Sequence, residues 1–261
     1  MNHNILPAIG GLAIAIAITT TMDATGYTMF SALPLFPLAG LFWYLQKFSR
    51  VEIGLAWGQT KYYGLALLYP VLVLGTMAAI AYMAGAVDTS AANWQNTLLN
   101  MGAMSTMGTL ILVLTEEGFF RGWLWAALKR NGQTDAQVLI WSSLGFTAWH
   151  VSAISLDTGF DLPADEIPIF LVNATLIGGI FGLIRMISGS VVAASLCHAV
   201  WNGIDYPLFG FGEKIGALGI EQTHIYGPEV GILGIGLNLL FFVYLWRKYA
   251  TQDAEISSKM H

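Results

Sequence analysis

Cysteine is nearly absent from the chain: among 261 residues, Cys197 is the only one. A single thiol cannot form an internal disulfide, and it cannot supply a metal site with several cysteine ligands. The sequence also lacks a repeat of roughly 20–50 residues, which excludes solenoid and array architectures. The fold must therefore depend on non-covalent packing within one continuous unit.

Charge is scarce as well. Charged residues make up 10% of the chain, whereas a soluble domain carries roughly a quarter, and 56% of the residues are hydrophobic. The basic residues are spread thinly along the chain, so a nucleic acid is not an expected partner. This composition indicates an integral membrane protein surrounded by membrane lipids.

Apolar runs recur along the whole chain, each near the ~20 residues that a helix needs to cross the hydrocarbon core. They predict an all-α polytopic membrane protein with eight transmembrane helices around a polar intramembrane cavity. The connections between them are too short for a soluble domain, so we expect a single integral membrane domain over residues 1–261. The expected spans are 5–22, 26–46, 62–85, 102–128, 136–156, 167–187, 190–208 and 229–246.

The basic residues give an orientation for these spans. With a cytoplasmic N-terminus, nine of the eleven basic residues fall on the inner side, while Lys214 lies outside and Arg121 lies within a span. Cytoplasmic loops carry an excess of Lys and Arg, so this asymmetry predicts cytoplasmic N- and C-termini, in the inner membrane of a bacterial or archaeal cell. The nine inner residues are Lys47, Arg50, Lys61, Lys129, Arg130, Arg185, Arg247, Lys248 and Lys259.

The stretch 114–125, LTEEGFFRGWLW, places three ionisable groups inside an apolar run. A charge at the bilayer centre costs about 2.5–3.5 kcal/mol on insertion scales, so such groups face a protein interior or a wet cavity. Glu117 and Arg121 are four residues apart and are expected to form an ion pair on one helix face, whereas Glu116 is rotated away from both. The pair alone would be structural. The second carboxylate needs another partner.

Two other spans supply that partner. His150 lies in FTAWH, and His198 and Asn202 lie one helical turn apart in HAVWN. Counted from the helix ends, Glu116, His150 and Asn202 all lie roughly 20 Å deep, so three helices are expected to present one polar cluster. Asp205 and Asn173 are further candidates for the cavity wall, although hydrogen bonds to backbone or water would explain them equally well.

Such a cluster suits hydrolysis of an amide without a serine or cysteine nucleophile. A carboxylate beside a histidine can take a proton from water and return it, while a histidine and an asparagine can donate hydrogen bonds to an oxyanion. Zinc hydrolysis is the alternative chemistry, with Glu116, His150 and His198 as the ligands. The sequence lacks HEXXH, and asparagine is a poor zinc ligand, so we expect no cofactor.

These residues resemble the three motifs of the CPBP family, which comprises the CAAX proteases and bacteriocin-processing enzymes. The family is also called Abi and is related to the eukaryotic Ras-converting endopeptidase. The resemblance covers about residues 113–206. The matching motifs are EExxxR, as Glu116, Glu117 and Arg121, then FxxxH, as Phe146 and His150, then HxxxN, as His198 and Asn202.

The resemblance implies an eight-helix intramembrane endopeptidase that acts on a peptide or a lipid-anchored protein. It implies that Glu116 and His150 activate water, that His198 and Asn202 form the oxyanion hole, and that Glu117 completes the catalytic set. Arg121 and Phe146 would be structural support.

Two other functions remain open at this point. A non-catalytic membrane adaptor or a bacteriocin-immunity protein would keep the polar cluster for folding or for binding a partner. A proton-coupled transporter would use buried Glu and His as a relay, but the sequence shows no inverted repeat and no paired broken helices.

Overall fold

The computed structural model describes residues 5–160, 162–212 and 214–259, with side chains described as far as residue 252. Helices account for nearly all of its regular structure, and the two strands pair antiparallel over two residues each. The elements are α1 Leu6–Ala24, η1 Thr28–Phe30, α2 Leu35–Gln46, η2 Thr60–Tyr62, α3 Tyr63–Met83, α4 Trp94–Leu114, η3 Gly118–Leu124, α5 Trp125–Arg130, α6 Asp135–Ser155, α7 Ile167–Ser188, α8 Val191–Phe209, β1 Gly210–Phe211, β2 Lys214–Ile215, α9 Thr223–Tyr226 and α10 Ile232–Lys259.

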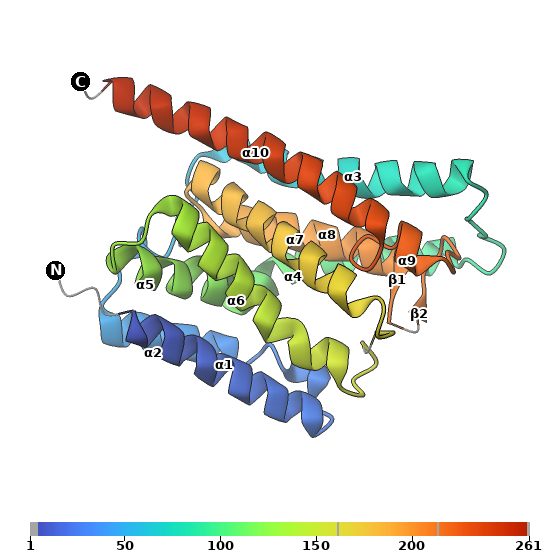
Figure 1. Ribbon diagram of the computed structural model, residues 1–261, viewed down its shortest axis with the longest axis horizontal. Coiled ribbons are helices and arrows are strands. Elements are labelled where there is room, and N and C mark those ends of the chain that lie inside the picture. Colours follow the sequence, from blue (N-terminus) through green and yellow to red (C-terminus); the bar gives the residue numbers. More distant parts are fainter. Residues whose placement is uncertain (1–4, 161, 213, 260–261) are drawn as a thin grey trace.

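Seven stretches of the described chain are long and apolar enough to cross a membrane. They contain α1, α2, α3, α4, α6, α7 and α10. The helix α8 is as long as α1, at 19 residues, but His198, Asn202 and Asp205 lower its mean hydropathy. It runs through the middle of the bundle as the eighth long helix (Figure 1). The predicted all-α polytopic architecture is confirmed.

The start of α1 and the end of α10 lie at the same end of the bundle, on the left of Figure 1. We call this the terminal end; it also holds the loop 47–59 and the turn between α7 and α8. The opposite end, the far end, holds the connections 25–34, 156–166 and 210–231. Both chain ends on one side fit an even number of passes.

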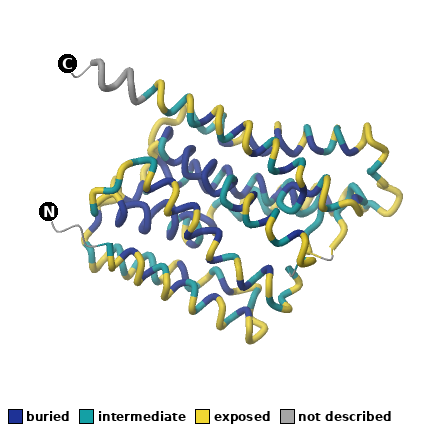
Figure 2. The backbone as a smooth tube through the Cα atoms, in the orientation of Figure 1, coloured by how far each residue is buried: buried dark blue, intermediate teal, exposed yellow. Residues whose placement is uncertain are grey.

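Buried residues gather in the middle of the bundle, in the segment 115–128 and in α7 and α8, while exposed residues cover the outer helices (Figure 2). The helix α4 is the extreme case, because most of its apolar side chains are exposed. In lipid, this exposure needs no covering partner. Its exposed large apolar residues are Trp94, Leu98, Leu99, Met107, Leu110, Ile111 and Leu114.

Local sequence signals explain the helix ends near the middle of the bundle. At the start of α6, Thr134 and Gln137 form a capping box, in which each side chain bonds the backbone N–H of the other. Gly189 ends α7 in a left-handed conformation, φ 75°, and the Ser190 hydroxyl then caps α8 by accepting from the Val192 N–H at 3.1 Å. This two-residue turn holds α7 and α8 antiparallel.

The fourth predicted span, 102–128, is wrong as a single helix. The helix α4 ends at Leu114, and Thr115 has a non-helical backbone, φ −105° and ψ −102°. The chain then continues through the π-helical segment η3 into α5. An unbroken helix over the 37 residues Trp94–Arg130 would be about 55 Å long, well beyond the ~30 Å hydrocarbon core. The run is therefore longer than a single pass needs, and it is interrupted at Thr115.

Candidate active site

A cavity of about 630 Å³ enters the bundle from the far end and reaches its middle. Residues of all three predicted motifs line its inner part: Glu116, Phe146, His150, His198 and Asn202. They come from three segments that are more than eighty positions apart at the extremes. The structure therefore brings the predicted polar cluster together around one open space.

The two adjacent glutamates after α4 point in different directions, as the rotation of about 100° per residue along a helix requires. Glu116 reaches the cavity, where its side chain is 15% exposed, whereas Glu117 is completely buried behind it. A Cβ on Gly118 would lie 2.3 Å from the Val113 carbonyl oxygen, so only glycine permits this close backbone approach. π-Helical turns are rare and are found mostly at functional sites, which agrees with the position of η3 beside the cavity.

Glu117 is held from two sides. Arg121 Nη1 donates to its Oε1 at 3.0 Å, which confirms the predicted ion pair, and His198 Nδ1 lies 3.0 Å from the same oxygen. All three side chains are buried, so the arginine charge offsets the cost of a carboxylate removed from water. Because Glu117 reaches the cavity only through His198, we treat it as a positioning residue.

The guanidinium of Arg121 is fixed by the neighbouring helices. Its Nη2 donates to the Gly178 carbonyl of α7 at 2.7 Å, and the Phe146 ring lies 4.4 Å from its Cζ. A Cβ on Gly178 would lie 2.9 Å from that Nη2, so the glycine leaves room for the guanidinium. Phe146 thus contacts the supporting arginine and also lines the cavity beside His150.

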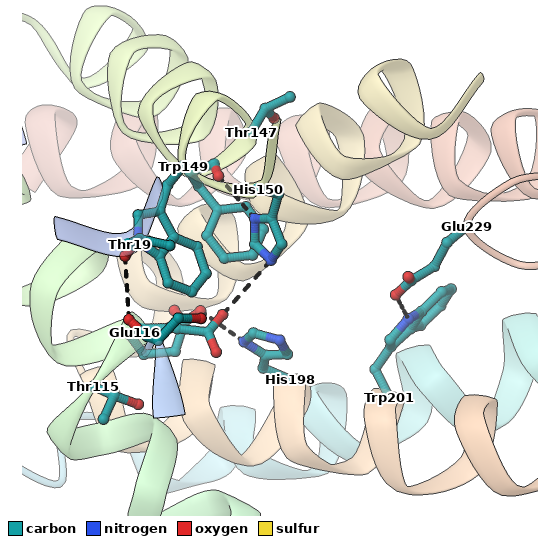
Figure 3. A network of polar contacts seen from close by, with 12 residues as sticks. Thr19, Thr115, Glu116, Thr147, Trp149, His150, His198, Trp201 and Glu229 are labelled. Carbon is teal, nitrogen blue, oxygen red and sulfur yellow. Dashed lines mark hydrogen bonds and ion pairs between the residues drawn. The ribbon is translucent and has the colours of Figure 1, made fainter. Parts of the chain in front are cut away.

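Glu116 and His150 face each other at the inner end of the cavity (Figure 3). The distance from Glu116 Oε2 to His150 Nε2 is 4.0 Å, too long for a direct hydrogen bond and short enough for one water molecule to contact both atoms. His150 Nδ1 lies 2.9 Å from the Phe146 carbonyl oxygen. A carbonyl can only accept, so Nδ1 carries a hydrogen and Nε2 is the atom that exchanges protons with the cavity.

The same argument fixes the tautomer of His198. Its Nδ1 donates to the Glu117 carboxylate, so its Nε2 is an acceptor when the ring is neutral and a donor when the ring is protonated. Phe181 stacks on the ring with centroids 4.5 Å apart and restricts its rotation. Asn202 lies one turn further along α8 and also lines the cavity. Within the described chain its amide has no hydrogen-bond partner, so its N–H groups are open to a ligand.

Other residues of the cavity were not singled out by sequence reasoning. Glu229 comes from the connection before α10, and its Oε1 accepts from Trp201 Nε1 at 3.0 Å. Glu166 lies at the start of α7 and accepts from the Thr223 hydroxyl at 2.7 Å. Glu166 directly precedes the predicted span 167–187 and Glu229 begins the predicted span 229–246, and no sequence pattern indicates that these span ends face the cavity.

Asp205 and Asn173, the further candidates from the sequence, differ in the structure. Asp205 lines the cavity, although it is only 2% exposed. Asn173 is fully buried and donates to the carbonyl oxygens of Glu229 and Gly231 at 3.0 and 3.3 Å. Asn173 therefore fixes the backbone that carries Glu229.

The zinc alternative can be tested against the donor geometry. Within the residues that the structure describes, no group of three or more His, Cys, Asp or Glu side chains is arranged to hold a metal ion. No step of the chemistry considered below passes through a metal.

Comparisons with known proteins agree with the motifs. No curated protein and no solved structure matches the chain. Residues 97–204 match the family described as type II CAAX prenyl endopeptidase Rce1-like, and this region runs from the first turn of α4 through most of α8 and contains every motif residue. The family resemblance indicated by the three motifs is thus confirmed by a family-model match over residues 97–204.

Proposed function

We propose that the protein is an intramembrane endopeptidase that hydrolyses a peptide bond in a membrane-associated peptide or lipid-anchored protein. One observation carries the proposal. Glu116 Oε2 and His150 Nε2 lie 4.0 Å apart at the inner end of a cavity that also exposes His198 and Asn202. A water molecule in contact with both atoms would have two acceptors for its proton and a carbonyl-sized space beside it.

In the first step, Glu116 takes a proton from this water while His150 Nε2 orients it. The resulting hydroxide attacks the carbonyl carbon of the substrate, and the carbonyl oxygen becomes an oxyanion. General base catalysis requires that the base lies within hydrogen-bond reach of the proton that it removes. The Phe146 carbonyl supports the step, because it holds His150 in the tautomer that leaves Nε2 facing Glu116.

The oxyanion is stabilised from α8. The Asn202 amide donates one hydrogen bond, and His198 Nε2 donates a second when the ring is protonated. Glu117 accepts from His198 Nδ1 at 3.0 Å and so stabilises the imidazolium form. Glu116 then returns its proton to the leaving nitrogen, the carbon–nitrogen bond breaks, and the products are a carboxylic acid and an amine.

Replacement of Glu116 tests the enzyme directly. We expect Glu116→Gln to lose at least about 10²–10⁴-fold in the rate of peptide cleavage, since the general base is removed and the shape is kept. The measurement is cleavage of co-purified membrane peptides and synthetic peptides by the detergent-solubilised protein. Glu221→Gln is the matched control, because Glu221 lies elsewhere on the cavity wall and takes no part in the mechanism.

Three outcomes would contradict the proposal. Full activity of Glu116→Gln would show that Glu116 is not the general base. Absence of any cleavage by the wild type would favour the adaptor or immunity function. Stoichiometric zinc together with a loss of activity on chelation, restored by zinc, would instead support metal hydrolysis.

The cavity also indicates the side from which substrate enters. It opens at the far end, opposite the terminal end with its basic residues, so the predicted orientation places the opening on the extracytoplasmic side. Cys197 is completely buried, which makes the wild-type chain a suitable background for added thiols. Ile215 at the far end and Val51 at the terminal end are both exposed, at 64% and 75%.

A membrane-impermeant maleimide should therefore label Ile215→Cys on intact cells, whereas Val51→Cys should react only after lysis. Labelling of both variants in lysed cells is the control for accessibility. The reverse pattern on intact cells would place the opening on the cytoplasmic side.

A further inference from the structure

Two carboxylates lie on the cavity wall between the water-activating pair and the far end. Asp205 belongs to α8, one turn beyond Asn202, and Glu229 belongs to the connection before α10. In Figure 3 the Trp201–Glu229 pair lies on the other side of His198 from Glu116. Neither carboxylate has a part in the hydrolysis described above.

The Asp205 carboxylate is buried and has no hydrogen-bond donor among the described residues. It is only 2% exposed, its Oδ1 is fully enclosed, and neither of its oxygens accepts a hydrogen bond from the described residues. A buried carboxylate without a partner costs several kcal/mol in other proteins, so such a group normally has a partner in the working state. Because Asp205 lines the cavity, a ligand in the cavity can be that partner.

Glu229 strengthens the negative character of this site. Its Oε1 accepts from Trp201 Nε1, while its other carboxylate oxygen has no donor in the described chain. Trp201 lies one turn before Asp205 on α8, so the hydrogen bond from Trp201 holds Glu229 on the side of the cavity wall that carries Asp205. Two adjacent carboxylates attract a positive charge between them.

The protein itself does not supply this positive charge. Lys214 is the one lysine or arginine among the described residues of the cavity wall, and its side chain is exposed. Its Nζ lies over the Phe211 ring, 4.7 Å from the centroid. Phe160 and Tyr206 flank Phe211, with ring centroids 4.5 and 5.2 Å from it, so the outer cavity has aromatic faces that suit a cation.

A metal ion is a poor fit, since no group of three or more metal-binding side chains is present in the described residues. An ammonium or guanidinium group needs only two carboxylates and accommodates aromatic neighbours. The rise of 1.5 Å per residue places Asp205 roughly 10 Å along α8 from His198. An extended peptide covers that distance in about three residues.

We propose that Asp205 and Glu229 form a subsite for a cationic side chain of the substrate, a lysine or an arginine within about three residues of the cleaved bond. The proposal rests on the proposed peptidase function and specifies its substrate class: peptides that carry a positive charge on the side toward the far end. Neutral lipidated peptides would occupy the same cavity without this contact.

The test measures binding in a protein that cannot cleave. Glu116→Gln protein in detergent is immobilised and incubated with synthetic peptides whose ends are capped, so that they carry no terminal charge. The peptides differ at one position, lysine against norleucine and arginine against citrulline, and mass spectrometry measures what is retained. We expect the charged peptides to be enriched about tenfold or more, as for a charge-assisted hydrogen bond.

Adding Asp205→Asn and Glu229→Gln should lower this enrichment to about one. The matched control is Asp157→Asn with Asp165→Asn, which removes the same charge from exposed positions at the far end outside the cavity wall. These control substitutions should keep the enrichment, which separates the subsite from general attraction to an acidic surface. Thermal unfolding reports whether each variant is folded.

Two results would overturn the subsite: no enrichment of charged peptides, or equal enrichment after Asp205 and Glu229 are replaced. If Asp205→Asn does not fold, Glu229→Gln alone must reduce the enrichment, and unchanged enrichment there would also overturn it. Failure of the wild type to cleave peptides would contradict the proposed function without affecting this binding comparison.

Discussion

The two ends of the bundle differ in whether their charged side chains are paired. At the terminal end, oppositely charged side chains pair: Arg130 donates to Glu52 at 2.7 Å, and Lys129 contacts Asp135. At the far end, carboxylates face a cavity without a lysine or arginine partner in the described chain. The buried Glu117–Arg121 pair lies between the two. The charges at the terminal end thus compensate each other, whereas those on the wall of the far-end cavity do not.

The largest expected effect comes from breaking the buried Glu117–Arg121 ion pair in the middle of the bundle. Arg121→Met should destabilise the protein by about 3–5 kcal/mol, because it leaves Glu117 buried without its cation. The measurement is thermal or denaturant unfolding in a fixed detergent. Arg130→Met at the terminal end is the matched control and should cost less than about 1 kcal/mol, as for an exposed ion pair. Equal losses in both variants would contradict the comparison.

An intermediate effect is expected at the break that carries Glu116. Gly118→Ala puts a methyl group 2.3 Å from the Val113 carbonyl oxygen, so the backbone must shift and Glu116 with it. We expect a loss of about 1–3 kcal/mol in stability and at least about tenfold in peptide cleavage. Gly102→Ala in α4 has open space and should be neutral or slightly stabilising. Wild-type activity in Gly118→Ala would show that the break does not position Glu116.

The smallest effect is expected at the terminal end. The hydrogen bond from Arg130 and a second from the Ser49 N–H lower the pKa of the Glu52 carboxyl from its ordinary 4.5 to about 2. The contact therefore stabilises the fold above about pH 4.5, and this contribution is lost as the pH falls toward 2. Glu52 is 44% exposed, so the contribution is less than about 1 kcal/mol.

Glu52→Gln should accordingly lower Tm by no more than about 4 °C at pH 7, with a smaller difference in high salt. The difference between wild type and variant should shrink as the pH is lowered from 5 toward 2. If the Tm difference between wild type and Glu52→Gln grows on acidification, the pKa of Glu52 is not lowered by folding.

The helical architecture was predictable because lipid imposes a simple rule on the sequence. Every span needs a long apolar run, and hydropathy alone finds α1, α3, α6 and α7 within a few residues of their ends. The break at Thr115 was not predictable from such a rule. Gly118 and Gly122 lower the helix propensity of this run, but glycines also occur in the continuous helix α7, so they do not by themselves predict a break.

The site was predictable to the extent that helical spacing determines it. The i, i+4 pairs Glu117–Arg121 and His198–Asn202, together with equal depth, were sufficient to expect one polar cluster. The connection 210–231 was not, because its fold depends on hydrogen bonds to distant residues such as Asn173 and Asp88. Glu229 therefore could not be placed on the cavity wall from its position in the sequence.

The helix α4 meets lipid along most of its length and ends at the residue before Thr115, next to the proposed general base. A long lipid-facing helix responds to bilayer thickness by changing its tilt. Because Glu116 follows the end of this helix, we expect acyl chain length to change the spacing of the reacting groups.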